Sequence, residues 1–393
     1  MLVLVSIFLG ETQAGIYSIA TAQSLLFWTI AMFGMRRYQS SDVEHHFSFR
    51  EYATSRILTS GAMVVVGAIT CGVLMWTGGY SLEKAAVVLV STLLRVPDAM
   101  EDLIQGFLQQ SGRLDVGSKI STVRVSASTL GFAVPVMAGG SLLTALGVQL
   151  VVSAGVLAFC VRLVVPDFLD PQARRGQMKQ VFRLLRTCLP LFASGFLALY
   201  ISNAPKYGID AVLDDQAQAK FNYLSMPSFV IQMLALFIFN PLIFRLSTSW
   251  VEGRTSDMMK IVGRVVLWIA GITAACLVGG GLIGLPILSW LYQTDLSGYL
   301  WQFLILLLSG GFVALGGFLT TMLTIMRYHR VLIVGYIASA IVAVTSSWWI
   351  RWGNLMGASL LYATLFLLQC AIFVPIMLYG VRRRNIEMTS DSG

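Results

Sequence analysis

The sequence predicts an all-α integral membrane protein with about 12 transmembrane helices. Its 393 residues are 56% apolar and only 12% charged, whereas roughly 25% of the residues in an average soluble domain are charged. The mean hydropathy is +0.76. Apolar runs of about 18 residues or more recur from end to end, and in hydrocarbon a helix satisfies its own backbone hydrogen bonds. A soluble globular chain is therefore excluded.

The apolar runs define the expected helices in order. Met1–Leu9 is apolar, but a span needs about 20 residues, so this run is too short to cross unaided. It lacks the basic residues of a signal peptide, and we expect it to be the outer half of a truncated first helix. Eleven full spans are expected after it, at residues 16–35, 57–76, 85–110, 118–138, 142–165, 187–204, 221–244, 261–284, 300–326, 331–350 and 355–381.

The basic residues orient these spans. Of the 27 Lys and Arg residues, 22 fall on one set of alternate loops, including Arg113, Lys119 and Arg124 after the span 85–110. Arg95 lies inside a span. Cytoplasmic loops carry the excess of Lys and Arg, so both termini are expected in the cytoplasm and the protein in the inner (cytoplasmic) membrane. The opposite set of loops holds only Lys84, Lys206, Lys220 and Arg351.

A basic, apolar segment divides the chain into halves. Residues 166–186 contain DPQARRGQMKQVFRLLR, a pattern typical of an interfacial amphipathic helix. We expect an N-terminal helix bundle over residues 1–165, this segment as a cytoplasmic linker, a C-terminal bundle over 187–381 and a cytoplasmic tail over 382–393. Two halves with such a linker are typical of transporters.

The sequence contains few residues or motifs that are typical of an enzyme. It contains no phosphate-binding G-x-x-x-x-G-K-[ST], no G-x-S-x-G and no H-E-x-x-H. The three histidines and five cysteines do not stand at metal-ligand spacing, so we expect no metal and no cofactor. The net charge of +8 follows from the loops, and we expect no nucleic-acid partner.

One span carries charges. The segment LLRVPDAMEDLIQGFLQQ, residues 93–110, places Arg95, Asp98, Glu101 and Asp102 on one side of a helix, and Pro97 is expected to kink it. Facing lipid, each charge would cost roughly 2.5–3.5 kcal/mol, so the stripe is expected to face the protein interior and a hydrated cavity. Two alternatives remain. The cluster neutralises itself and only holds helices together, or the span ends early and Glu101 and Asp102 reach the inner interface.

A second polar group, SNAPKYGID at residues 202–210, lies at the outer end of the seventh span. Asn203, Pro205 and Lys206 are expected to break the helix there. Gly310, Gly311, Gly316 and Gly317 in the tenth span are expected to allow close helix approach.

Short motifs recur in order along the chain. In the first half they are Leu9-Gly10-Glu11 followed by Ala14-Gly15-Ile16-Tyr17, then Phe33-Gly34-Met35, Phe49-x-x-Tyr52-x-x-x-Arg56 and Gly106-Phe107-Leu108-Gln109-Gln110-x-Gly112-Arg113. In the second half they are Pro205-Lys206-Tyr207, Phe221-Asn222-Tyr223, Asn240-Pro241-Leu242 and Gly284-Leu285-Pro286. With these motifs the chain resembles the oligosaccharide (polysaccharide) flippases, of the lipopolysaccharide biosynthesis protein type, in the MOP (multidrug/oligosaccharidyl-lipid/polysaccharide) exporter superfamily.

The resemblance implies a MATE-like transporter fold, with two six-helix bundles that form a V around a central cavity. It implies alternating-access translocation of a polyprenyl-pyrophosphate-linked oligosaccharide for cell-surface polysaccharide biosynthesis. The expected partners are this lipid-linked substrate, membrane lipids and other envelope polysaccharide assembly proteins.

An anionic headgroup of this kind suggests roles for the charged residues. Arg95 is the expected phosphate anchor, and Arg36, Arg37 and Arg56, at the inner mouth, are expected to attract the headgroup. Asp98, Glu101 and Asp102 are expected to bind H⁺ or Na⁺, or to balance the charge of Arg95.

Two other functions stay open. A multidrug/organic-cation antiporter of the same superfamily is favoured by the charge of −2 that Arg95, Asp98, Glu101 and Asp102 carry together. A non-transporting scaffold for envelope assembly would tolerate neutralisation of Arg95 and the acidic residues together.

Overall fold

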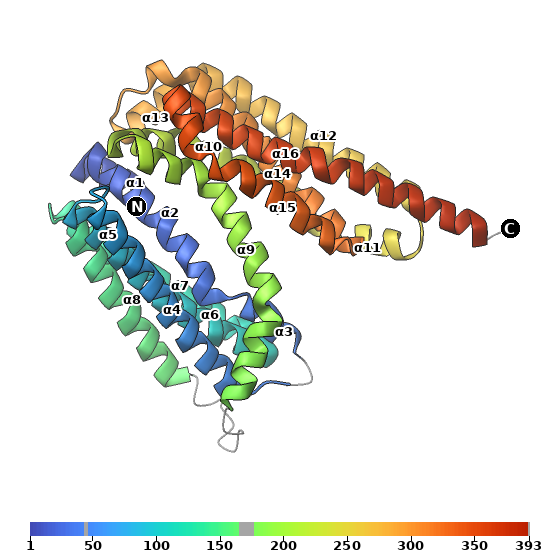
Figure 1. Ribbon diagram of the computed structural model, residues 1–393, viewed down its shortest axis with the longest axis horizontal. Helices are drawn as coiled ribbons and strands as arrows, with labels where there is room; N and C mark the ends of the chain where they lie inside the picture. The colour runs from blue at the N-terminus through green and yellow to red at the C-terminus, as the bar shows by residue number, and fades with distance from the viewer. Residues whose placement is uncertain (43–45, 165–176, 392–393) are drawn as a thin grey trace. The chain divides into compact units, whose positions relative to one another are not determined.

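The computed structural model describes residues 1–42, 46–164 and 177–391, and these residues form helices and no strand (Figure 1). The helices before the gap at residue 165 are α1 (Leu2–Leu9), α2 (Glu11–Met32), α3 (Met35–Ser41), α4 (Phe49–Trp76), α5 (Leu82–Leu93), α6 (Arg95–Gln110), α7 (Leu114–Met137) and α8 (Leu142–Val164). Those after it are α9 (Met178–Val212), α10 (Asp215–Phe239), α11 (Ile243–Val251), α12 (Thr255–Gly279), α13 (Leu285–Tyr292), α14 (Leu300–Ile325), α15 (His329–Val344) and α16 (Ser346–Asp391).

The predicted spans correspond to helices. In the described part of the chain, nine helical segments are long and apolar enough to cross a membrane. Two further predicted spans are divided: residues 85–110 form α5 and α6, and residues 331–350 form most of α15 and the start of α16. The gap predicted after residue 350 coincides with Asn354, where the backbone of α16 leaves the helical region (φ 49°, ψ −131°). The predicted fold class, an all-α multi-pass membrane protein, is confirmed.

The chain divides into two compact units, Met1–Leu199 (unit 1) and Tyr200–Gly393 (unit 2). The division falls inside α9. Of the predicted linker, residues 166–176 lie outside the described residues and Met178–Arg186 forms the first turns of α9, while residues 382–391 of the predicted tail continue α16. The predicted domain limits remain a prediction.

In unit 1, α2 packs against α1, α4 and α5, and α7 packs against α8. The buried face of α2 contains Ala14, Gly15, Ala20 and Ala22, and such small side chains let membrane helices approach closely. α2 ends where Phe33 and Gly34 both adopt the left-handed conformation, with φ of 46° and 68°. This turn starts the short helix α3, which carries Arg36 and Arg37.

The predicted single span 85–110 breaks at Leu94, three residues before Pro97. Because proline has no N–H, it removes a helical hydrogen bond to the preceding turn and favours a break there. The helix is thus interrupted one turn before Pro97, where a kink was expected, and Arg95 is the first residue of α6.

The break predicted at Asn203–Lys206 is wrong, because α9 is continuous from Met178 to Val212. A membrane helix tolerates an internal proline when neighbouring helices and local adjustment satisfy the freed backbone group. Ile201 and Ala204 are buried in a cluster with Leu361 and Leu365 of α16, and this packing stabilises the helical conformation on both sides of Pro205.

In unit 2, α14 is central and packs on α10, α12 and α16. A Cβ on Gly310 would lie 2.9 Å from the carbonyl oxygen of Ser228 on α10, and one on Gly311 would lie 2.5 Å from Oγ1 of Thr273 on α12. The expected close approach is confirmed at Gly310 and Gly311. It is wrong at Gly317, where a Cβ would meet nothing within 4 Å.

Candidate functional site

The charged stripe of α6 lies inside unit 1. Helix α6 contacts α2, α3, α4 and α7, and the side chains of Glu101 and Asp102 are buried. The stripe therefore faces the protein interior, as its cost in lipid predicts.

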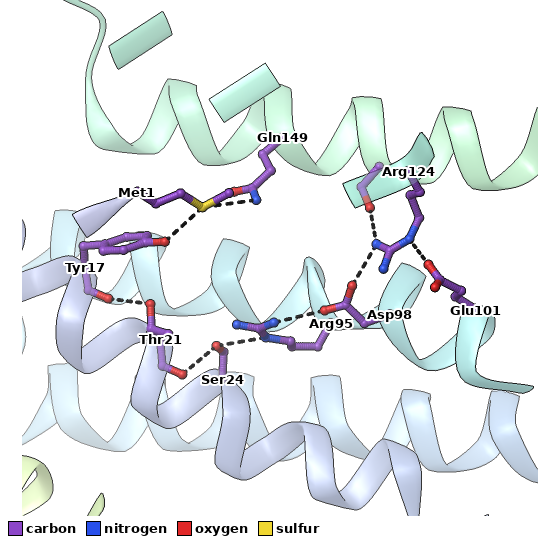
Figure 2. A network of polar contacts seen from close by, with 10 residues as sticks. Met1, Tyr17, Thr21, Ser24, Arg95, Asp98, Glu101, Arg124 and Gln149 are labelled. Carbon is purple, nitrogen blue, oxygen red and sulfur yellow. Dashed lines mark hydrogen bonds and ion pairs between the residues drawn. The ribbon is translucent and has the colours of Figure 1, made fainter. Parts of the chain in front are cut away.

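One half of the cluster is centred on Arg124 of α7 (Figure 2). Its Nη1 donates to Asp98 Oδ1 at 2.8 Å and to Ser153 Oγ on α8 at 2.7 Å, and its Nε donates to Glu101 Oε2. Arg95 Nη1 donates to the other oxygen of Asp98 at 3.0 Å, and Arg95 Nε donates to Ser24 Oγ on α2 at 3.3 Å. Asp98 is thus held between two guanidinium groups.

The other half is centred on Asp102. Arg56 Nη2 of α4 donates to Asp102 Oδ2 at 2.7 Å, and Arg36 Nη1 of α3 donates to Asp102 Oδ1 at 3.3 Å. Gln105 joins the two halves, because it accepts from Arg36 Nη1 at 2.7 Å and donates to Glu101 Oε1 at 2.6 Å. We call this whole set the charge network; it consists of Arg36, Arg56, Arg95, Asp98, Glu101, Asp102, Gln105 and Arg124.

The network has one net positive charge when all its groups are ionised, because it contains four arginines and three carboxylates. The charge of −2 considered above omitted Arg36 and Arg56 as well as Arg124. The assignment of Arg124 to a cytoplasmic loop is wrong: it is buried within α7. The two carboxylates that it contacts explain its burial, because a buried guanidinium needs charged partners.

A cavity of about 270 Å³ opens onto this network within unit 1. Its lining includes Arg95, Asp98, Arg124, Tyr17 and Gln149. The side chains of Arg95 and Asp98 are each 20% exposed, so both are accessible from it. Figure 2 shows Tyr17 and Gln149 directed at the sulfur of Met1, which also lines the cavity, and Arg95 held by Ser24 and Asp98. A cavity with guanidinium, phenol and amide groups can bind an anionic, hydroxyl-rich ligand.

The three arginines expected at the inner mouth lie in different environments. The side chain of Arg36 is 34% exposed, and Arg37, the next residue of α3, is exposed. Arg56 is 0% exposed and also donates from Nη1 to the carbonyl oxygen of Ala31 at 2.7 Å. In this structure Arg56 is therefore buried among helices and is not exposed, as an arginine at the predicted inner mouth would be.

Sequence reasoning missed the role of Arg124 and the supporting hydroxyls of Ser24 and Ser153. A signal was present, since Ser121, Arg124 and Ser128 stand at helical spacing within an apolar run. Nothing in the sequence, however, relates Arg124 to Glu101, which lies a full helix earlier.

The described residues contain no group of three His, Cys, Asp or Glu side chains that could hold a metal ion.

The fold is that of a multi-pass helical membrane protein. The family model "Polysaccharide biosynthesis protein" matches residues 1–247. The chain belongs to this family, a flippase family of the MOP superfamily, as the sequence motifs indicated.

Solved structures of MATE transporters share the fold. An inward-facing multidrug resistance MATE transporter of the MOP superfamily matches with a TM-score of 0.66 and 12% identity, over 98% of this chain and 93% of that chain. A MATE structure in the bent conformation matches with a TM-score of 0.52 and 13% identity, over 100% and 92%. An outward-facing MATE transporter matches with a TM-score of 0.52 and 14% identity, over 94% and 86%. No curated protein matches the sequence.

Proposed function

We propose that this protein is a flippase that moves a polyprenyl-pyrophosphate-linked oligosaccharide across the cytoplasmic membrane, by alternating access, for cell-surface polysaccharide biosynthesis. Its family and fold are those of transporters and flippases, not of enzymes. The lipid-linked glycan, the inner membrane and the cytoplasmic termini are parts of the proposal.

The observation that carries the proposal is the net positive charge network beside a polar cavity. A pyrophosphate and its sugars need a hydrated, cationic path through the hydrocarbon, whereas the polyprenyl tail remains in lipid. The cavity in unit 1 offers guanidinium groups together with hydroxyl and amide groups for sugars.

Arg95 is the residue that we assign to the pyrophosphate. An arginine has five N–H donors. Its contacts to Ser24 and Asp98 use Nε and Nη1, and we assign Nη2, on a side chain accessible from the cavity, to a phosphate oxygen. Arg36, which is half-exposed, is the second candidate contact. Arg56 supports the network from its buried position by fixing Asp102.

We assign two different roles to the three carboxylates of the charge network. Glu101 and Asp102 are buried against arginines and balance charge. Asp98 alone of the three lines the cavity, so we assign to it any coupling to H⁺ or Na⁺.

The organic-cation antiporter is the principal competing function. The MATE structures with this fold include multidrug resistance transporters, but at 12–14% identity the likeness extends to the fold alone. One net positive charge in the network opposes the binding of an organic cation.

A proteoliposome assay tests the proposal against both alternatives. The purified chain is reconstituted with a fluorescent polyprenyl-pyrophosphate oligosaccharide, and the fraction of label that becomes accessible across the bilayer is measured against empty vesicles. We expect translocation of the glycan lipid and none of ethidium. Ethidium transport without glycan translocation would identify an antiporter. Transport of neither compound would favour the scaffold.

A further inference from the structure

A second basic pocket lies in unit 2, where the end of α11 meets the ends of α14 and α16. It has a volume of about 480 Å³. Its lining includes Trp250, Val251, Arg327, Tyr328, Arg383 and Arg384. The charge network belongs to unit 1, so this pocket is a separate site.

The position of the Arg384 side chain suits the binding of an anion. Its guanidinium carbon lies 5.6 Å from the centre of the Trp250 ring, and this cation–π contact fixes the plane of the side chain. Its Nε is buried and has no hydrogen-bond partner among the described residues. A buried donor of this kind is costly unless a ligand satisfies it.

Arg327 occupies an unusual backbone position. It follows the end of α14 with a φ of 64°, a conformation that favours glycine. The turn is closed by hydrogen bonds from Arg327 N to Thr324 O at 3.0 Å and from Tyr328 N to Leu323 O at 2.8 Å. Glycine is the residue that a positive φ favours. The arginine found here instead places a positive charge at the pocket.

Two arginines of this pocket, Arg327 and Arg384, have no carboxylate partner among the described residues. The neighbouring pocket between α11 and α12 also contains Arg245 and Arg264, but its Lys260 lies 3.2 Å from Asp257 and its Arg254 pairs with Glu252. These two paired cations therefore provide a matched control.

The surroundings favour a lipid over a soluble anion. Val251 lines the pocket and is 74% exposed, and Ile325 adds apolar surface. Trp and Tyr, here Trp250 and Tyr328, are typical of the membrane–water interface. The pocket also lies at the arginine-rich ends of α14 and α16, which the charge distribution predicts to be cytoplasmic, and basic pockets between helices on that side bind anionic headgroups.

We propose that this pocket binds the phosphate headgroup of an anionic phospholipid, with Arg327 and Arg384 contacting the phosphodiester and an acyl chain lying along Val251. Lipid binding at this site would anchor unit 2 in the inner leaflet, whether or not the transported substrate is bound.

Binding of dioctanoyl phosphatidylglycerol and dioctanoyl phosphatidylcholine to the detergent-solubilised full chain, measured by native mass spectrometry, tests the proposal. The test variant is Arg327→Gly with Arg384→Gln, and the control variant is Arg254→Gln with Lys260→Gln. Glycine suits the φ of residue 327, so Arg327→Gly alone serves as a variant that keeps the fold.

We expect phosphatidylglycerol to bind more tightly than phosphatidylcholine, and each arginine removed to weaken binding about fivefold. The control variant should bind like the wild type. Equal binding of both lipids, or equal losses in test and control variants, would overturn the proposal. Displacement of phosphatidylglycerol by an equal concentration of inorganic pyrophosphate would identify a site for soluble phosphates instead.

Discussion

Arg124 Nη1 lies 2.8 Å from Asp98 Oδ1, and this contact joins α7 to α6 inside unit 1. The same guanidinium also reaches Glu101 and Ser153, so one side chain holds three helices together. Because Arg124 and Arg95 share Asp98, Nη2 of Arg95 remains available to the cavity.

Replacement of Arg124 should be the most damaging change in the network. Arg124→Gln would leave Glu101 buried without its cationic partner, and removal of one member of a buried ion pair costs about 3–5 kcal/mol. We expect a large fall in the melting temperature of the detergent-solubilised protein. The control is Arg113→Gln, which disrupts an exposed pair with Asp115 and should leave the melting temperature unchanged. Equal melting temperatures for the two variants would contradict the structural role of Arg124.

Close helix packing in unit 2 should depend on Gly310. A Cβ there would meet the backbone of Ser228, so Gly310→Ala must separate α10 from α14 and should cost about 1–3 kcal/mol. Gly317 lies on the same helix with open space around it, and Gly317→Ala should be neutral or slightly stabilising. Thermal unfolding of both variants checks this prediction, which fails if the alanine at 310 is tolerated as well as that at 317.

Stability should fall in acid because of Asp42, which lies outside the spans. Burial raises the pKa of Asp42, but hydrogen bonds from His46, the backbone N–H of Phe47 and the Tyr52 hydroxyl outweigh it and hold the pKa below its ordinary value. A lowered folded-state pKa contributes stability above the unfolded-state pKa, and that stability is lost as the pH falls through the folded-state value.

For Asp42 the loss should therefore begin below about pH 4. Melting temperatures measured from pH 6 to pH 3 should fall less steeply in Asp42→Asn than in the wild type. Parallel curves would show that Asp42 does not contribute to the acid sensitivity.

The orientation can be tested with reporters. The Lys and Arg distribution predicts a cytoplasmic C terminus, so green fluorescent protein fused after Gly393 should fluoresce in the host cell. Alkaline phosphatase fused after Gly78, between α4 and α5, should be active because that loop is predicted to lie outside. The opposite pair of results would reverse the topology.

The sequence predicts the helices well because apolar run length and charge placement decide membrane insertion one segment at a time. The interruption at Leu94 could be anticipated as a kink because Pro97 lacks a backbone N–H. The continuity of α9 through Pro205 could not be predicted, since it depends on packing against α16. The charge network shows the same limit: its α6 members stand in one stripe of sequence, whereas the pairing with Arg124 and the burial of Arg56 arise only when helices assemble.

The central claim, that Arg95 holds an anionic headgroup during translocation, is tested most directly by the rate of glycan-lipid translocation in proteoliposomes containing Arg95→Gln. Asp98 keeps Arg124 as a partner in this variant, so the fold should be retained, and equal melting temperatures would verify that. We expect the translocation rate of Arg95→Gln to fall about tenfold or more, because the variant loses one charge-assisted hydrogen bond to the headgroup. Arg95→Lys should have an intermediate rate, and the control Arg113→Gln should translocate at the wild-type rate. Translocation by Arg95→Gln at the wild-type rate would contradict the account.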